Sequence, residues 1–341
     1  MEKLKEATLY EKLENKRVKC NLCSFHCTVE EGRMGICKTR ANKNGVFYAL
    51  SYGRAYGYSI EPIEKKPFYH YKPGSKVLSF GTPGCNFSCL NCQNYFMSQS
   101  TKEIENAYRE VKFTAPKEIV TAGENADGFA YTYTEPTIFY EYFKDCVEEQ
   151  IKEKKEKFNV WVSNGYYSKQ LLNEIMKEKK LDAARIDLKF VSNENYAKVC
   201  KASLKPVIEN IKGLAKSKVF IELINLVIPG FNDTEEQITE LTELIKGIDK
   251  KIPLHFLRFY PYYKMQGVPS TPDETLEKAL KIGRENLEYV YAGNASIKGG
   301  EDTHCPECGK TLIKRRGMDI IENVLTEPFC PKCGREINLI I

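Results

Sequence analysis

Residues 76–94 read KVLSFGTPGCNFSCLNCQN, and this stretch is the strongest indication of both fold and chemistry in the chain. It begins with an apolar run at 77–80, which is typical of a buried strand. The loop that follows carries Cys85, Cys89 and Cys92 with the spacing C-x3-C-x2-C. A 4Fe-4S cluster ordinarily takes four protein thiolates, so three of them leave one iron open to another ligand. The spacing therefore predicts a 4Fe-4S cluster with an accessible iron, and a three-cysteine zinc site is the alternative.

Beyond this stretch, short apolar strands alternate with amphipathic helices. Further strands are expected at 129–133, 159–162, 186–188, 219–227, 255–260 and 289–291. Helices are expected to begin near Pro116, Pro136, Ser168, Asn193, Thr234 and Pro272. Alternation of this kind implies parallel strands joined by crossover helices. The expected fold class is therefore α/β, an open and partial (βα)6 TIM-like barrel.

Two flanking regions do not follow the alternation, and each contains four cysteines. We expect residues 1–75 to form a cysteine-rich N-terminal lobe, residues 76–300 the partial barrel, and residues 301–341 a zinc-ribbon or rubredoxin-like tail. Each flank is too small to form a good core without a metal. The chain is thus predicted to have one large domain with two metal-stabilised appendages.

The tail contains two matching knuckles, Cys305-Pro-Glu-Cys308-Gly and Cys330-Pro-Lys-Cys333-Gly. The glycine lets each knuckle turn tightly, so that four sulfurs can surround one ion. This pattern predicts a zinc ribbon, with rubredoxin-like iron as the alternative. Because sulfur would occupy every ligand position, the site is expected to be structural.

The N-terminal set is Cys20, Cys23, Cys27 and Cys37, with the spacing C-x2-C-x3-C-x9-C and His26 adjacent. These thiols indicate a metal. We favour zinc, because the spacing is short and irregular and lacks a ferredoxin pattern. An auxiliary iron-sulfur cluster that relays electrons or positions substrate is the alternative.

Composition limits the remaining function classes. The chain has 341 residues, 42% of them hydrophobic, and a net charge of +5 from 51 basic and 46 acidic residues. Charged runs such as 152–157 mix both signs, so nucleic acid is a possible partner but is not favoured. The N-terminus is charged and no run of ~18 apolar residues occurs, so we expect a cytoplasmic protein without membrane association. Clustered cysteines indicate a reduced compartment, and the remaining two, Cys146 and Cys200, are expected to be small buried apolar residues.

The cysteine spacing, on a loop after the first strand of a βα series, resembles the radical S-adenosylmethionine (SAM) superfamily over about residues 75–300. The closer resemblance is to activating enzymes of the pyruvate formate-lyase type, and within them to the AmmeMemoRadiSam system radical SAM enzyme. The stretches that match are Ile60–Pro67, Cys92–Asn94, Tyr131–Pro136 and Phe259–Met265. The resemblance implies SAM as a second cofactor, bound at the open iron and cleaved by one electron to a 5′-deoxyadenosyl radical.

The resemblance also implies which residues hold SAM. Tyr133-Thr134-Glu135-Pro136 stands where the family often has Gly-Gly-Glu-Pro, so Glu135 is expected to accept a hydrogen bond from the methionine amino group. Capping of the helix at Pro136 is the alternative role. Ser163 and Asn164 resemble the ribose and carboxylate contacts, with a plain strand-to-helix turn as the alternative.

Three further charged residues are candidates for SAM binding. Asp187 and Lys189 lie on one face of a strand, and the same tripeptide occurs in activating enzymes near the methionine end of the cofactor. Arg258 is favoured over His255 as the cavity-facing residue of the sixth strand. The family's aromatic residue before the third cysteine is here Asn91, which leaves Tyr95 or Phe96 as candidates for the adenine contact.

The expected reaction is SAM cleavage followed by hydrogen abstraction from carbon, with a reductant protein of the ferredoxin or flavodoxin type as partner. An activase that forms a glycyl radical in a partner protein is one specific version. A nucleic-acid-modifying enzyme, with Lys314-Arg315-Arg316 holding RNA, is an alternative, and a redox adaptor without an enzyme site is another. No catalytic hydrogen-atom donor and no substrate can be singled out.

Overall fold

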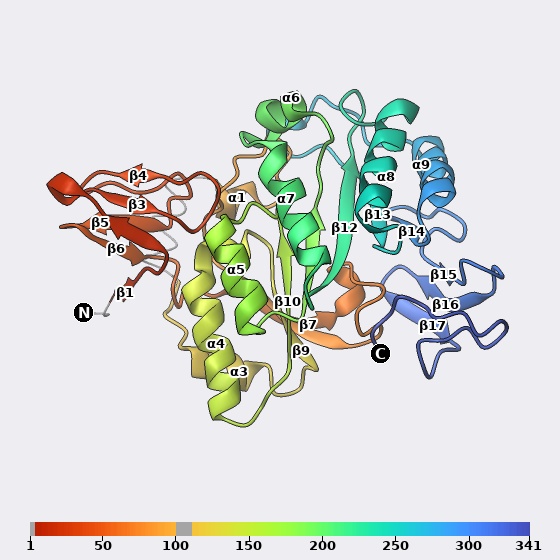
Figure 1. Cartoon of the computed structure of the whole chain (residues 1–341), viewed down its shortest axis with the longest axis horizontal. Coiled ribbons are helices and arrows are strands. Elements are labelled where there is room, and N and C mark those ends of the chain that lie inside the picture. Colours follow the sequence, from red (N-terminus) through yellow and green to blue (C-terminus); the bar gives the residue numbers. More distant parts are fainter. Residues whose placement is uncertain (1–3, 100–110) are drawn as a thin grey trace.

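The computed structural model describes residues 4–99 and 111–341 and has an eight-stranded sheet at its centre (Figure 1). The strand order across this sheet is β14-β13-β12-β11-β10-β9-β8-β7. Edge strand β7 (Tyr56–Pro62) runs antiparallel to β8 (Lys76–Gly81), and the strands from β8 onward are parallel. These are β9 (Gly128–Tyr131), β10 (Phe158–Ser163), β11 (Ala183–Asp187), β12 (Phe220–Val227), β13 (Leu254–Arg258) and β14 (Val290–Gly293).

A crossover helix joins each parallel strand to the next. In chain order these helices are α3 (Pro116–Ala122), α4 (Tyr140–Lys152), α5 (Lys169–Glu178), α7 (Leu204–Ala215), α8 (Glu235–Asp249) and α9 (Asp273–Asn286). The order gives six βα units followed by β14, which confirms the expected α/β class and partial barrel. Within the described residues β7 and β14 are the two ends of the sheet, so the barrel is open. None of the helices in these ranges is long and apolar enough to cross a bilayer.

The helix expected to begin near Asn193 begins there but is short and irregular. It consists of α6 (Asn193–Asn195), which continues into a π-helical turn, η4 (Tyr196–Cys200). Lys201 ends this segment because it adopts a left-handed conformation with φ 58°. The η4 turn lies against the first cysteine loop, where the Ser88 N–H donates to the Cys200 carbonyl at 3.3 Å. Cys200 is therefore placed beside the site rather than in an ordinary helix.

The N-terminal lobe consists of two small antiparallel sheets at one end of the molecule (Figure 1). One contains β1 (Lys5–Glu6), β6 (Val46–Ala49) and β5 (Arg40–Lys43), and the other contains β2 (Tyr10–Lys12), β3 (Val18–Cys20) and β4 (Thr28–Val29). Val18 and Phe47 of the lobe belong to the same buried cluster as Phe80 and Phe139 of the barrel. The lobe and the barrel thus share one core. Strand β7, although it lies within residues 1–75, extends the barrel sheet.

The opposite end of the barrel is closed by the segment before β8 and by the C-terminal tail. Glu222 of β12 is fully buried and accepts hydrogen bonds from the backbone N–H groups of Tyr69, His70 and Tyr71 at 3.0, 2.8 and 3.2 Å. His255 bonds the same carboxylate at 2.7 Å. The tail forms the sheet β15-β16-β17 with strands Thr303–His304, Thr311–Arg316 and Asp319–Asn323. Arg315 of the tail donates to the Tyr69 carbonyl at 2.8 Å, so the tail is joined to the same buried polar network as the segment before β8.

Candidate active site

Cys85, Cys89 and Cys92 lie on the loop between β8 and α1 (Tyr95–Ser98), at the carboxyl end of the first parallel strand. Cys89 is buried and the other two are half-buried. The Phe87 N–H donates to Cys85 Sγ at 3.4 Å, and the Ser98 hydroxyl lies 3.2 Å from Cys92 Sγ. Hydrogen bonds of this kind stabilise a thiolate rather than a thiol. Burial nevertheless raises the pKa of the Cys85 and Cys92 thiols. The loop therefore presents three sulfur ligands, two of which already have hydrogen-bond partners in the surrounding chain.

The three cysteines share one cavity at the end of the first parallel strand. Among the residues that the structure describes, they are not part of a compact four-sulfur group like that in the tail. Three thiols that face a common open space fit the predicted 4Fe-4S cluster, in which one iron stays open to another ligand.

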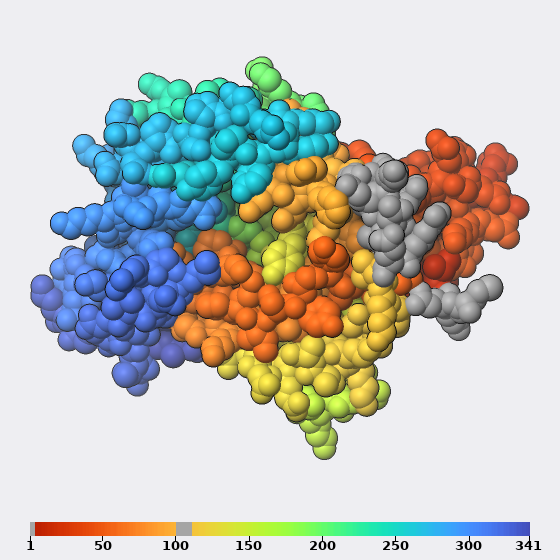
Figure 2. Space-filling model, turned by 180° about the vertical axis from the view of Figure 1, so that it is seen from behind, coloured from red at the N-terminus to blue at the C-terminus, as the bar shows by residue number. Residues whose placement is uncertain are grey.

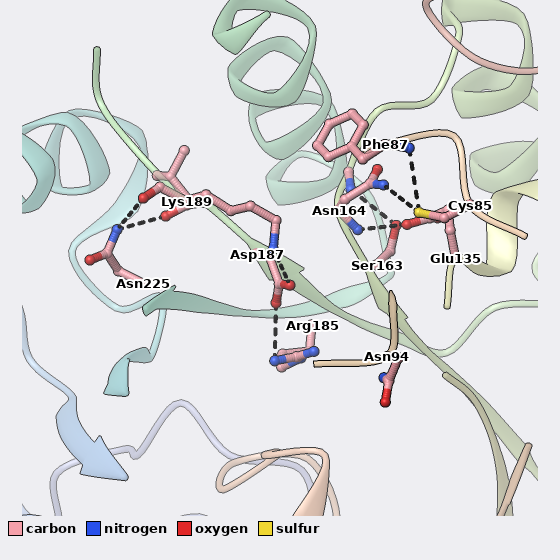
Figure 3. A network of polar contacts seen from close by, with 12 residues as sticks. Cys85, Phe87, Asn94, Glu135, Ser163, Asn164, Arg185, Asp187, Lys189 and Asn225 are labelled. Atoms are coloured by element: carbon pink, nitrogen blue, oxygen red, sulfur yellow. Dashed lines mark hydrogen bonds and ion pairs between the residues drawn. The ribbon is translucent and has the colours of Figure 1, made fainter. Parts of the chain in front are cut away.

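Asn164, at the carboxyl end of β10, connects this loop to the neighbouring strand. Its side-chain amide donates to Asn86 Oδ1 at 2.7 Å and lies 4.0 Å from Cys85 Sγ (Figure 3). A similar contact comes from the other end of the loop, where the Asn94 amide donates to the Tyr133 carbonyl at 2.6 Å. The cysteine loop is therefore held at both ends by the loops that follow β9 and β10.

Glu135 is fully buried, and its carboxylate is engaged by neighbouring donors. It accepts from the Ser163 hydroxyl at 2.8 Å, the Asn164 N–H at 2.8 Å and the Thr137 hydroxyl at 2.6 Å. The Thr137 N–H also donates to it at 3.1 Å, as a helix-capping role requires. Burial raises the pKa of Glu135, although these hydrogen bonds oppose the shift. Its contact with a methionine amino group stays a prediction, while its support of Ser163 and Asn164 is direct.

Asp187 and Lys189 come together with Arg185, which lies on the same face of β11 (Figure 3). Asp187 is 2.8 Å from Lys189 Nζ and 3.0 Å from Arg185 Nη1. Burial would raise the pKa of Asp187, but the two cations hold it below its ordinary value. Burial lowers the pKa of Lys189, but Asp187 and the thiol of Cys89 outweigh this and raise it. Both partners are therefore charged inside the barrel.

A cavity of about 1090 Å³ connects these groups. At the cysteine end it is lined by Cys85, Cys89, Cys92, Ser163, Asn164, Asp187 and Lys189. At the other end it is lined by Lys66, Tyr69 and Arg315. Figure 2 shows the corresponding hollow, which lies between the orange segment below it and the cyan and lighter blue segments above it. The predicted ligands and most of the predicted SAM contacts thus share one accessible space inside the barrel.

Arg258 stands apart from this group. It lines the cavity at the end of β13 but forms an ion pair with Asp273 at the start of α9. His255 of the same strand also lines the cavity and is buried against Glu222. Tyr95, a candidate for the adenine contact, instead stacks on Tyr263 with ring centroids 4.5 Å apart. Neither arrangement brings Arg258 or Tyr95 into contact with the Asp187 and Lys189 pair.

Comparison with known proteins decides the family. The radical SAM superfamily model matches residues 80–244. An uncharacterized protein of Methanocaldococcus jannaschii is 41% identical over 344 residues, covering 99% of this chain and 100% of that protein. The chain belongs to the radical SAM superfamily. Members of this superfamily are enzymes with a 4Fe-4S cluster and SAM, so the chain is an enzyme and the residues of the cysteine loop fit its expected cluster.

Two more distant relatives of this radical SAM protein are activating enzymes by name. A putative glycyl-radical enzyme activating enzyme of Methanocaldococcus jannaschii is 24% identical, covering 71% of this chain and 63% of that protein. Pyruvate formate-lyase 1-activating enzyme of Escherichia coli K12 is 23% identical, covering 62% of this chain and 89% of that protein. Among solved structures, a radical SAM methyltransferase from Sphaerobacter thermophilus has a TM-score of 0.47 at 11% identity, over 65% of this chain and 70% of that one.

Sequence reasoning missed three residues of this radical SAM site. Cys200 is buried in the core as expected, but the sequence did not indicate that it lies beside Cys89, where a hydrogen bond with Cys200 lowers the pKa of the Cys89 thiol. The Asn86 side chain accepts a hydrogen bond from the Asn164 amide, and Arg185 forms an ion pair with Asp187. Alternation along β11 places Arg185 on the same face as Asp187, so strand periodicity could have found it. No local pattern could have found Cys200, because its position depends on the turn η4.

The C-terminal cysteines form a separate and compact site. Cys305 Sγ lies 3.6 Å from Cys333 Sγ, and Cys308 Sγ lies 3.6 Å from Cys330 Sγ. All four sulfurs lie within 4.8 Å of one another. This is the spacing that a tetrahedral ion with bonds of about 2.3 Å requires. The four predicted cysteines therefore come together in the tail in an arrangement that could hold a metal, and zinc remains the proposed ion.

Proposed function

We propose that the protein reductively cleaves SAM at a 4Fe-4S cluster held by Cys85, Cys89 and Cys92 and then abstracts hydrogen from a substrate in the barrel cavity. The observation that carries this proposal is the convergence of the three thiols with Asp187 and Lys189 on one cavity. When bound, the cluster and SAM supply one-electron cleavage of the sulfur–carbon bond and a 5′-deoxyadenosyl radical.

The chain's own residues bind and orient the cofactor in this proposal. Asp187 accepts a hydrogen bond from an ammonium group, and Lys189 pairs with a carboxylate, so together they suit the two charged groups of a methionine moiety. Ser163 and Asn164, held by Glu135, offer hydroxyl and amide groups to the ribose or carboxylate. Arg258, which lines the same cavity, is assigned to the same cofactor. The barrel, expected at 76–300, provides these groups, and the flanking regions 1–75 and 301–341 support it.

Most of the basic side chains that line the cavity are paired within the protein. Lys65 and Lys66 pair with Glu61, Arg185 and Lys189 pair with Asp187, and Arg258 pairs with Asp273. The charge of the lining therefore does not single out a class of substrate.

A glycyl-radical activase is the more specific candidate, and the names of two distant relatives support it. In that case the substrate is a glycine of a partner protein that enters the open side of the barrel. The electron donor is proposed to be a ferredoxin or flavodoxin in the cytoplasm. An RNA-modifying enzyme has less support. Arg315 is buried and bonded to Thr303 and Tyr69, so Lys314-Arg315-Arg316 is not a continuous RNA-binding surface.

The test is formation of 5′-deoxyadenosine by protein reconstituted without oxygen, reduced with dithionite and given SAM. The matched variants are Cys89→Ala in the cysteine loop and Cys308→Ala in the tail. We expect product from the native protein and from Cys308→Ala, and none from Cys89→Ala. If native protein with confirmed cluster content forms no product, the protein is a redox adaptor instead.

A further inference from the structure

The N-terminal lobe brings four thiols together beside the barrel. Cys20 ends β3, and its N–H donates to the Cys27 carbonyl at 2.8 Å. Cys20, Cys23 and Cys37 are buried, and Cys27 is half-buried. A Cβ placed on Gly35 would stand 3.8 Å from Cys37 Sγ and 4.0 Å from Cys27 Sγ, so these two sulfurs approach the same point. The Thr39 hydroxyl donates to Cys37 Sγ at 3.2 Å, so this sulfur already has a hydrogen-bond partner.

The spacing of these sulfurs differs from that of the zinc-type site in the same chain. In the tail, all four sulfurs lie within 4.8 Å of one another. Within the described residues no three of the N-terminal sulfurs meet that condition, and neither do Cys85, Cys89 and Cys92. The N-terminal set therefore lacks the compact four-sulfur arrangement of the tail site, and four thiolates are also the ordinary ligand set of a 4Fe-4S cluster.

The N-terminal thiols are also next to the catalytic cysteine loop. The Cys37 carbonyl lies 2.9 Å from the point where a Cβ on Gly84 would stand, and Gly84 directly precedes Cys85. Gly84 has φ +97°, a conformation that glycine adopts readily, and the missing side chain permits this close approach. The backbones that carry Cys37 and Cys85 are consequently in direct contact.

Aromatic rings connect the two sets of thiols. Phe25, between Cys23 and Cys27, packs against Tyr166 at 4.8 Å and against Phe87 at 6.5 Å between ring centroids. Phe87 in turn lies between Cys85 and Cys89 and packs on Tyr166 at 5.1 Å. The turn is fixed to the barrel because the Ser24 N–H donates to the Tyr166 carbonyl at 3.1 Å. The two cysteine loops are therefore joined by a continuous set of packed side chains.

We propose that Cys20, Cys23, Cys27 and Cys37 bind a second iron-sulfur cluster, placed to pass electrons to the cluster at Cys85, Cys89 and Cys92. In this role a one-electron donor of the ferredoxin or flavodoxin class reduces the N-terminal cluster. The N-terminal cluster is then oxidised again as that electron moves to the catalytic one. The relay role depends on the proposed SAM cleavage, but the identity of the N-terminal cofactor does not. The proposed iron-sulfur cluster replaces zinc, which the cysteine spacing alone had favoured at this site.

The first experiment measures iron and zinc in protein reconstituted anaerobically with iron and sulfide, in the absence of SAM. We expect about eight irons and about one zinc per chain in the native protein. The variant Cys85→Ala/Cys89→Ala/Cys92→Ala should keep about four irons and, after reduction with dithionite, the EPR signal of a reduced cluster. Adding Cys23→Ala and Cys27→Ala should remove that iron and signal, and Cys308→Ala alone should remove only zinc.

About four irons and two zincs in the native protein would overturn the proposal, whatever happens to SAM. The native measurement needs no variant, so it decides the matter even if the triple variant does not fold. The position of the second cluster is tested by EPR of the fully reduced native protein. Two neighbouring paramagnetic clusters should broaden each other's signals relative to the triple variant, and two independent, additive signals would overturn the relay role. Because neither readout uses SAM, failure of SAM cleavage is recognised separately.

Discussion

The Asn164 side chain donates a 2.7 Å hydrogen bond to Asn86, and this contact joins the end of β10 to the loop that carries Cys85. Both residues are buried. The same Asn164 is fixed by Glu135 through its backbone N–H at 2.8 Å. A chain of hydrogen bonds therefore runs from Glu135, at the start of the helix, to the loop that carries Cys85, and this loop is oriented before any cofactor binds.

Asn164→Ala should loosen the cysteine loop. Losing a buried hydrogen bond and leaving Asn86 without its partner costs about 1 to 3 kcal/mol. We expect a lower free energy of unfolding and a faster loss of cluster iron to a chelator. Asn286→Ala is the control, because Asn286 bonds Thr242 between α8 and α9, far from the loop in sequence. Equal iron loss from both variants would show that the Asn164 contact does not hold the loop.

Glu135→Gln distinguishes the two roles of Glu135. The buried carboxylate accepts from Ser163, Asn164 and Thr137, so an amide NH2 at this place would face a donor. We expect the apoprotein to lose about 1 to 3 kcal/mol of unfolding free energy in urea, before SAM is added. Unchanged apoprotein stability combined with weaker SAM binding would instead assign Glu135 to the cofactor alone.

Gly84→Ala tests the contact between the lobe and the cysteine loop. A Cβ there would lie 2.1 Å from Thr39 Cγ2 and 2.9 Å from the Cys37 carbonyl. Gly230→Ala is a matched control, because Gly230 has a similar φ of +78° but no atom within 4 Å of the added Cβ. Backbone strain of about 1 to 3 kcal/mol is common to both. We expect Gly84→Ala to lower the melting temperature and the iron content clearly more than Gly230→Ala does. Equal decreases in the two variants would show that the lobe can move away from the cysteine loop.

His70 should make stability depend on pH. It is buried between the Asn338 carbonyl at 2.6 Å and the Tyr291 hydroxyl at 2.5 Å, and burial lowers its pKa to about 4. The unfolded chain, with a histidine pKa near 6.5, binds the extra proton first as the pH falls. The His70 contribution is therefore complete above about pH 6.5 and is lost as the pH falls toward 4, by about 3 kcal/mol. His70→Gln should flatten urea unfolding free energies between pH 7.5 and 5, and an unchanged slope would contradict this assignment.

Several parts of the protein could be predicted because they depend on local spacing. The strands and helices follow from apolar periodicity, and Ser168 and Thr234 cap their helices as expected. The position of Asp187 and Lys189 at a strand end follows from the rule that parallel strands end at the same edge of a sheet. The helix expected near Asn193 begins there, but its π-helical end could not be predicted, because the left-handed Lys201 that ends it has no strong sequence signature.

The amino-acid sequence by itself determined the family chemistry of this protein, because ligand spacing in Cys85, Cys89 and Cys92 and alternation of strands and helices are properties of neighbouring residues. Only the tertiary structure decided which residues meet across the chain. It placed Cys200 beside Cys89, joined Asn164 to Asn86, and brought the lobe carbonyl of Cys37 against Gly84. Such contacts depend on how distant segments pack into one core, and packing is not encoded in any short stretch of sequence.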